Sequence, residues 1–190
     1  MKKLTVLITA IVLALIPMTA VAQKNVAKLD DGAVVYYSNA NYIMLNLLTH
    51  AQVDYRVVSM WKDGVDLGYY FMISSNYGNP TISKENRILF RLDNGDVITC
   101  QALRDYGEED KVSAQNATSD AASQKYIQGY YKVSNEDLET LMSSTIIKMR
   151  VEFNNLNVDL DEKKCKAVPK NIQLSYNKVN ELIKGNAEEF

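Results

Sequence analysis

The stretch Ile88–Ala102, with the sequence ILFRLDNGDVITCQA, decides the fold. Apolar residues alternate with other residues on both sides of the turn Asp93–Asp96, which contains Asn94-Gly95. An Asn-Gly pair between two such runs is typical of a tight β-hairpin, because the central residues of that turn need positive φ angles. The sequence therefore predicts a hairpin whose buried side carries Phe90, Leu92, Ile98 and Cys100.

Alternation at 53–61, 67–74 and 145–153, and strand-like composition at 33–37, 126–133 and 158–160, predict further strands. Residues 42–48 fit both the period of a strand and the spacing of a helix, and we favour a strand there. Residues 105–125 lack a period and predict a long loop. Ser134 can cap a short helix, and the helical spacing of Ile172–Ile183 predicts a second helix that ends at Gly185. The fold class is therefore α+β: an antiparallel β-sheet of roughly six to eight strands, with two helices in the C-terminal part packed on one face.

The N-terminus has the pattern of a secretory signal peptide. Lys2-Lys3 is followed by an apolar run over Leu4–Met18 and by the A-x-A site Ala20-Val21-Ala22. A membrane anchor is the alternative, but the run is short for one. We expect cleavage between Ala22 and Gln23, no lipid anchor because no cysteine lies nearby, and a periplasmic or secreted protein. The predicted organisation is a signal peptide at 1–22, a flexible leader at 23–32 and a single α+β domain at 33–190.

Charge and cysteine content narrow the function classes. Cleavage would leave 19 basic against 23 acidic side chains, a formal charge of −4. This balance argues against nucleic acid or anionic lipid as the partner, since both need a dense basic patch. No stretch of the mature chain is long and apolar enough to span a membrane. Of the two cysteines, Cys100 and Cys165, two unpaired thiols are favoured slightly over one disulfide.

The region from Ile88 to Ile183 resembles small exported sheet-plus-helix proteins of the Bacteroidota. The resemblance rests on three pieces: LFRLDNGDVI at 89–98, YKVSNEDLETL at 131–141 and IIKMRVE at 146–152. It covers about half of the mature chain. It implies a periplasmic or secreted setting and a small domain of sheet and helices, and it carries no catalytic residue.

Few side chains could support catalysis. His50 is the only histidine, so a site with two or more imidazoles is impossible, and the phosphate-binding and nucleophile motifs are absent. We expect no cofactor and no metal. The acidic clusters are Glu108-Glu109-Asp110 and the pair Asp159/Asp161. Because Asp159 and Asp161 share a strand face, a carboxylate-dependent hydrolase acting on polysaccharide is the alternative function.

Tyrosine is unusually frequent, with 12 residues against 1 Trp and 4 Phe. Adjacent strand residues point to opposite faces, so placing Tyr69 and Tyr131 in the core would turn a second set outward. Exposed tyrosines combine a large ring with a polar tip and suit binding of a protein or glycan. We therefore predict an exported, non-enzymatic binding domain for a protein or glycan partner in the cell envelope, with a binding face formed by Tyr70, Tyr126 and Tyr130.

Overall fold

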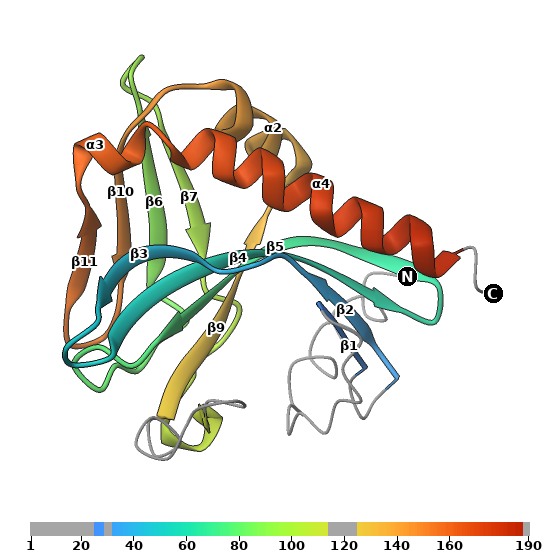
Figure 1. Ribbon diagram of the computed structural model, residues 1–190, viewed down its shortest axis with the longest axis horizontal. Coiled ribbons are helices and arrows are strands. Elements are labelled where there is room, and N and C mark those ends of the chain that lie inside the picture. The colour runs from blue at the N-terminus through green and yellow to red at the C-terminus, as the bar shows by residue number, and fades with distance from the viewer. Residues whose placement is uncertain (1–24, 29–31, 114–124, 188–190) are drawn as a thin grey trace.

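The computed structural model describes residues 25–28, 32–113 and 125–187. The predicted signal peptide and its cleavage site lie outside these residues. The described chain is an α+β fold in which strands come first and helices follow (Figure 1). The class and the antiparallel pairing agree with the sequence prediction, but the strands divide between two sheets instead of forming one.

The larger sheet has the strand order β1-β2-β4-β5-β9-β8, with β3 also paired to β4. Its long strands are β4, β5 and β9. The sequence predicted all three, because the side chains on one face of each strand are mostly apolar. The strand bounds are β1 Val26–Lys28, β2 Val34–Tyr37, β3 Asn41–Asn46, β4 Ala51–Lys62, β5 Val65–Ser75, β8 Val112–Ser113 and β9 Lys125–Val133.

The smaller sheet has the order β11-β10-β6-β7 and is antiparallel throughout. Its centre is the predicted Asn-Gly hairpin, in which Gly95 has a φ of 95°. The strand bounds are β6 Arg87–Leu92, β7 Val97–Gln101, β10 Ile146–Glu152 and β11 Asn157–Leu160. The two sheets meet at β7 and β9, where Ala102 and Tyr131 form a single bridge.

The helices are α2 Asn135–Ser143, α3 Glu162–Cys165 and α4 Val168–Ala187, with a short 3₁₀ turn η1 at Glu108–Asp110. Ser134 caps α2 as predicted, since its side chain accepts a hydrogen bond from the Asp137 N–H. Pro169 stands in the first turn of α4, where its missing N–H costs nothing. Gly185 is not the predicted C-cap, because α4 continues through it to Ala187.

The main core lies between the two sheets and α4. Phe71 on β5 meets Phe90 on β6 with ring centroids 5.5 Å apart, which joins the sheets. The predicted buried side of the β6–β7 hairpin is confirmed, because all four of its named residues are buried. At the other end, α4 crosses the larger sheet (Figure 1), where the Tyr69 hydroxyl donates to Asn180 at 2.6 Å.

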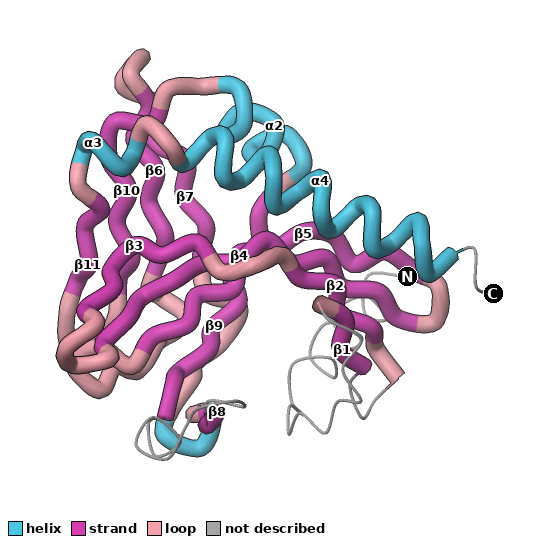
Figure 2. Tube along the Cα trace, in the orientation of Figure 1, coloured by secondary structure: helices cyan, strands magenta, loops and turns pink. Residues whose placement is uncertain are grey.

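Both cysteines are free and buried, as the sequence analysis favoured. The predicted leader is partly structured, because β1 pairs with β2 through Val26, Ala27 and Lys28. The predicted loop at 105–125 also contains structure, namely η1 and the short strand β8, which lies at the end of β9 (Figure 2). Within the described ranges, no helix combines the length and the apolar character needed to cross a membrane.

Candidate functional site

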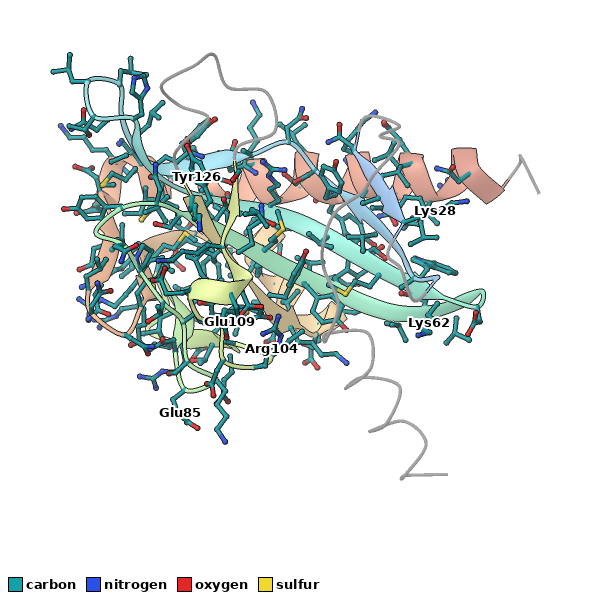
Figure 3. All side chains as sticks on the ribbon, turned by 90° about the horizontal axis from the view of Figure 1, so that it is seen from below. Lys28, Lys62, Glu85, Arg104, Glu109 and Tyr126 are labelled. Carbon is teal, nitrogen blue, oxygen red and sulfur yellow. The ribbon has the colours of Figure 1, made fainter. Side chains whose placement is uncertain are left out.

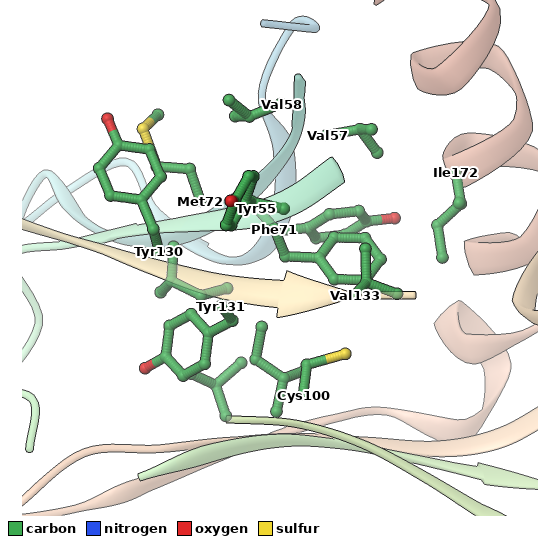
Figure 4. Close-up of a cluster of buried hydrophobic side chains, with 14 of the residues drawn as sticks. Tyr55, Val57, Val58, Phe71, Met72, Cys100, Tyr130, Tyr131, Val133 and Ile172 are labelled. Atoms are coloured by element: carbon green, nitrogen blue, oxygen red, sulfur yellow. The ribbon is translucent and has the colours of Figure 1, made fainter. Parts of the chain in front are cut away.

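The tyrosines of the larger sheet divide between its two faces as alternation predicted. The register places Tyr131 opposite Phe71 on the face that meets the smaller sheet, and places Tyr130 opposite Met72 on the other face. Figure 4 shows Tyr130 and Tyr131 projecting from opposite sides of β9, with Tyr131 on the side that also holds Cys100. We call the face that carries Tyr130 the outer face of the larger sheet.

The prediction that Tyr70 and Tyr130 are exposed is wrong. Tyr70 is 3% exposed and Tyr130 is 5% exposed, whereas Tyr126 is partly exposed. Burial raises the pKa of Tyr130, and the charges that act on it come from the segment after β7, from β4 and from β2. Side chains from three separate segments therefore surround Tyr130, and alternation along one strand cannot foresee them.

Tyr106 is the clearest of these neighbours. Its hydroxyl accepts a hydrogen bond from the Tyr130 N–H at 3.1 Å, and the Arg104 guanidinium lies 4.3 Å from its ring centroid. A Cβ at Gly129 would lie 2.6 Å from Ile82 and 3.4 Å from the Tyr106 ring. A side chain at position 129 would therefore push the end of the Ile82 side chain away, whereas glycine leaves it in place beside the Tyr106 ring.

The outer face also carries a buried charge that the sequence analysis did not select. Asp54 on β4 has a fully buried side chain, and its Oδ1 lies 3.7 Å from Nε of Arg56, whose side chain is 29% exposed. Gln52 donates to the other carboxylate oxygen at 3.1 Å. The Arg56 guanidinium also lies 5.7 Å from the ring centroid of Tyr37. The sequence does contain a sign of this pair, because Asp54 and Arg56 share one face of a strand that is otherwise mostly apolar.

Burial dominates the electrostatics of this pair. Desolvation raises the pKa of Asp54 to about 6, although the positive charge of Arg56 and the bond from Gln52 act in the opposite direction. Tyr126 has its pKa raised by burial and by the charges of Asp54 and Tyr42. Tyr42 is opposite Asp54 in the sheet and 52% exposed. Asp54, Tyr42 and Tyr126 therefore gather in one place.

The carboxylates proposed for hydrolysis are engaged elsewhere. Asp159 binds Arg150 through two hydrogen bonds of 2.6 and 2.8 Å, and the Arg150 guanidinium helps to lower its pKa. Asp161 caps α3 by accepting from the Lys163 N–H. A general acid needs a raised pKa, so Asp159 is poorly suited to that role.

The second acidic cluster is also bound in ion pairs. Asp110 pairs with Arg104, and Glu108 pairs with Lys111. Figure 3 labels Arg104 and Glu109 close together on this segment, apart from Tyr126. These ion pairs fix η1 to the residues next to it in the sequence, and they leave no two unpaired carboxylates together in the cluster.

A different surface stands out at the turn between β3 and β4. Leu45 is 46% exposed, Leu47 is 76% exposed and Leu48 is 94% exposed, and we call these three residues the leucine turn. Tyr77, which is 42% exposed, follows Asn76 in the adjoining loop. Isolated exposed leucines are common, but three within four positions, at the end of β3 and in the turn after it, form a patch.

The leucine turn is held in one shape by two asparagines. The Asn46 side chain accepts hydrogen bonds from the Leu48 and Thr49 N–H groups at 3.0 and 3.2 Å. The Asn76 side chain accepts from the Gln52 N–H at 2.8 Å and donates to the His50 carbonyl at 3.0 Å. The turn therefore presents its leucines on a hydrogen-bonded frame, which lowers the entropy lost on binding.

Over the ranges 25–28, 32–113 and 125–187, no three His, Cys, Asp or Glu side chains are grouped so that they could hold a metal ion. His50 lies in the exposed turn next to the leucines with a φ of 53°.

The chain was also compared with known proteins. No protein-family model, no curated protein and no solved structure matches it.

Proposed function

We propose that this chain is an exported, non-enzymatic binding domain and that its leucine turn engages a protein partner. The main support is the exposure of two leucines, 76% for Leu47 and 94% for Leu48. They lie on a turn that hydrogen bonds from Asn46 and Asn76 hold in place. Neither leucine contributes to the buried core of the fold. The sequence of residues 1–22 and the resemblance to small exported proteins of the Bacteroidota support the exported setting.

The chemistry of the turn favours a protein over a glycan or a lipid surface. Branched aliphatic side chains neither hydrogen-bond to sugar hydroxyls nor offer a flat ring, whereas they fill apolar pockets of proteins well. Residues 41–53 contain no Lys or Arg. The turn therefore lacks the positive charge that draws a loop to anionic lipid.

Site-specific photocrosslinking tests this proposal. A benzoylphenylalanine placed at Leu48 should give a discrete heteromeric adduct in the native cells. The matched control is the same probe at Leu174, which is 58% exposed on α4 and should give no such adduct. The double substitution Leu47→Ser/Leu48→Ser should lower the affinity for the identified partner at least tenfold, measured with purified proteins.

Three results would contradict the proposal. They are equal adducts at positions 48 and 174, an adduct of two copies of this chain, and binding of the Leu47→Ser/Leu48→Ser variant at the wild-type affinity. Crosslinking to lipid, or flotation with neutral vesicles that the double substitution abolishes, would assign the turn to a membrane surface instead.

A further inference from the structure

The leucine turn is part of a larger surface at one end of the molecule. Three segments meet there: residues 45–53, which contain the leucine turn, residues 76–83, which follow β5, and residues 153–158, which lead from β10 into β11 (Figure 1). None of the three contains Lys, Arg, Asp or Glu, although these residues make up 23% of the chain. We call this surface the uncharged end.

Hydrogen bonds join the three segments to one another. The Asn76 side chain accepts from one backbone group of the first segment and donates to another. Asn155 donates to the Gly78 carbonyl oxygen at 2.9 Å, and Asn154 donates to the Thr81 hydroxyl oxygen at 2.9 Å. Because these amides are engaged within the protein, the segments are held in place before a partner arrives, and the surface loses less entropy on binding.

Each segment contributes an apolar side chain to this end. Leu47 and Leu48 are the exposed leucines of the turn, Tyr77 is 42% exposed, and Leu156 is partly exposed. Leu156 lies against Gly78, since a Cβ added to that glycine would be 2.6 Å from the leucine side chain. The apolar surface therefore extends from the leucine turn to the two neighbouring segments.

Two charges that adjoin the uncharged end are withdrawn from it. Asp54 directly follows the first segment, and its side chain is fully buried. The Lys111 side chain is 2% exposed, pairs with Glu108 and donates to Asn79 at 2.6 Å. Neither Asp54 nor Lys111 is therefore open to a partner that covers this end.

The lack of charged residues in the three segments restricts what can cover them. A charged side chain of a partner would lose its water there without gaining an opposite charge, and such unpaired burial is costly. Apolar side chains with a rim of uncharged hydrogen-bonding groups carry no such penalty. The uncharged end also offers no opposite charge that would steer a charged partner toward it.

We propose that the protein partner covers all three segments of the uncharged end and presents to them an apolar pocket without charged side chains. This inference rests on the proposed function, to which it adds the extent of the interface and the chemistry of the partner's surface. The leucine turn enters the pocket, and Tyr77 and Leu156 contact its rim.

Photocrosslinking at further positions tests the extent of the interface. Benzoylphenylalanine at Tyr77 or at Asn157 should give an adduct with the same protein as at Leu48. The matched control is the probe at Thr99, which is exposed on β7 and should give no adduct. An adduct at Leu48 that is missing at Tyr77 or Asn157 would overturn this inference and leave the proposed function standing. No adduct at Leu48, or an adduct there with lipid or with a second copy of the chain, would overturn both.

Substitutions of opposite charge test the chemistry of the pocket, with the purified partner at pH 8, where imidazole side chains are neutral. Thr49 is exposed in the segment that holds the leucine turn. Thr49→Asp and Thr49→Lys should each weaken binding about tenfold, because either charge would be buried without a counter-charge. Raising the salt concentration from about 50 to about 500 mM should change the wild-type Kd less than about twofold. Thr99→Asp and Thr99→Lys are the matched controls and should bind like wild type.

Weaker binding of one Thr49 variant and tighter binding of the other would overturn the inference in favour of a charged pocket, as would a Kd that rises about tenfold with salt. Wild-type affinity of both variants would show that the partner does not cover the turn. Circular dichroism checks that the variants fold. Tyr77→Ala, at an exposed position, should weaken binding about fivefold and decides the matter if the Thr49 variants misfold.

Discussion

The two hairpins β6–β7 and β3–β4 have the same topology and opposite chemistry at their turns. In β6–β7 the turn is polar, with Gly95 at its positive φ and the Asn94 side chain donating to Asp96 at 2.7 Å. In β3–β4 the turn carries Leu47 and Leu48 in solvent, and its positive φ belongs to His50. The first turn has the residues that folding requires, whereas the second has residues that folding alone does not explain.

The strands leaving the two turns differ as well. Along β6 and β7 buried and accessible positions alternate, as in a sheet with one covered face. Along β4, Val57–Met60 are consecutively buried, and Asp54 is buried among apolar neighbours. A charge buried in such a strand loses its hydration, and Asp54 recovers part of that loss through Gln52 and Arg56.

The largest expected difference between the hairpins concerns their effect on stability. Phe90→Ala removes a fully buried ring that stacks on Phe71, and it should lower the free energy of unfolding by about 3–5 kcal/mol. Leu48→Ser should change it by less than about 0.5 kcal/mol. Urea denaturation followed by circular dichroism measures both, and comparable losses would show that the leucine turn is a structural element.

The next effect is a pH dependence that belongs to the β3–β4 hairpin. Burial raises the pKa of Asp54 in the folded protein to about 6, from the 3.8 that is ordinary for aspartate. Between these two pH values the folded chain holds a proton on Asp54 that the unfolded chain has released. The stability contribution is therefore present below the unfolded pKa and is lost as pH rises through 6. It should amount to about 3 kcal/mol at most.

Denaturation of wild type and Asp54→Asn between pH 4 and 7 isolates this contribution. The wild-type free energy of unfolding should fall with rising pH relative to that of the variant. Asp93→Asn, which alters an exposed carboxylate in the other hairpin, is the matched comparison and should follow the wild-type curve. Parallel curves for wild type and Asp54→Asn would mean that Asp54 is solvated in the folded protein.

A smaller effect concerns the glycine of the polar turn. Gly95→Ala forces an L side chain into a φ of 95° and should lower the free energy of unfolding by about 1–2 kcal/mol. No atom lies within 4 Å of the added Cβ, so the loss would report backbone conformation alone. A thermal melt that is unchanged by this substitution would show that the turn readily adopts another type.

The smallest effect is the reverse substitution in the leucine turn. His50 adopts a φ of 53°, which costs free energy that glycine does not lose. Glycine also makes the unfolded chain more flexible, which offsets part of this gain, so His50→Gly should raise the free energy of unfolding by only about 0.5 kcal/mol. The same thermal melt measures it against Gly95→Ala. A destabilisation as large as that of Gly95→Ala would show that the His50 side chain itself supports the turn.

Local patterns predicted much of this fold because they depend on neighbouring residues only. Asn94-Gly95 located a hairpin, Ser134 located a helix start, and alternation assigned Tyr130 and Tyr131 to opposite faces. Those inferences need turn geometry, capping and the period of a strand. None of them requires knowledge of which strands pair over long distances.

The remaining features arise from such long-range contacts. The burial of Tyr130 depends on Tyr106, which lies in a stretch without any period. The division into two sheets comes from which strands pair over long distances, and Phe71 meets Phe90 across the core between them. The cluster of Asp54, Tyr42 and Tyr126 likewise depends on the pairing of Tyr42 with Asp54, which neither segment signals by itself.

The two enclosed thiols give this chain internal reporters of its own opening. Cys100 lies in β7 and Cys165 ends α3, and burial raises the pKa of the Cys100 thiol to about 12. A thiol that is neither exposed nor ionised reacts with alkylating reagents only when its surroundings separate. The labelling rate of Cys100 therefore measures how often the smaller sheet opens, and that of Cys165 measures how often α3 separates from it, without any engineered probe.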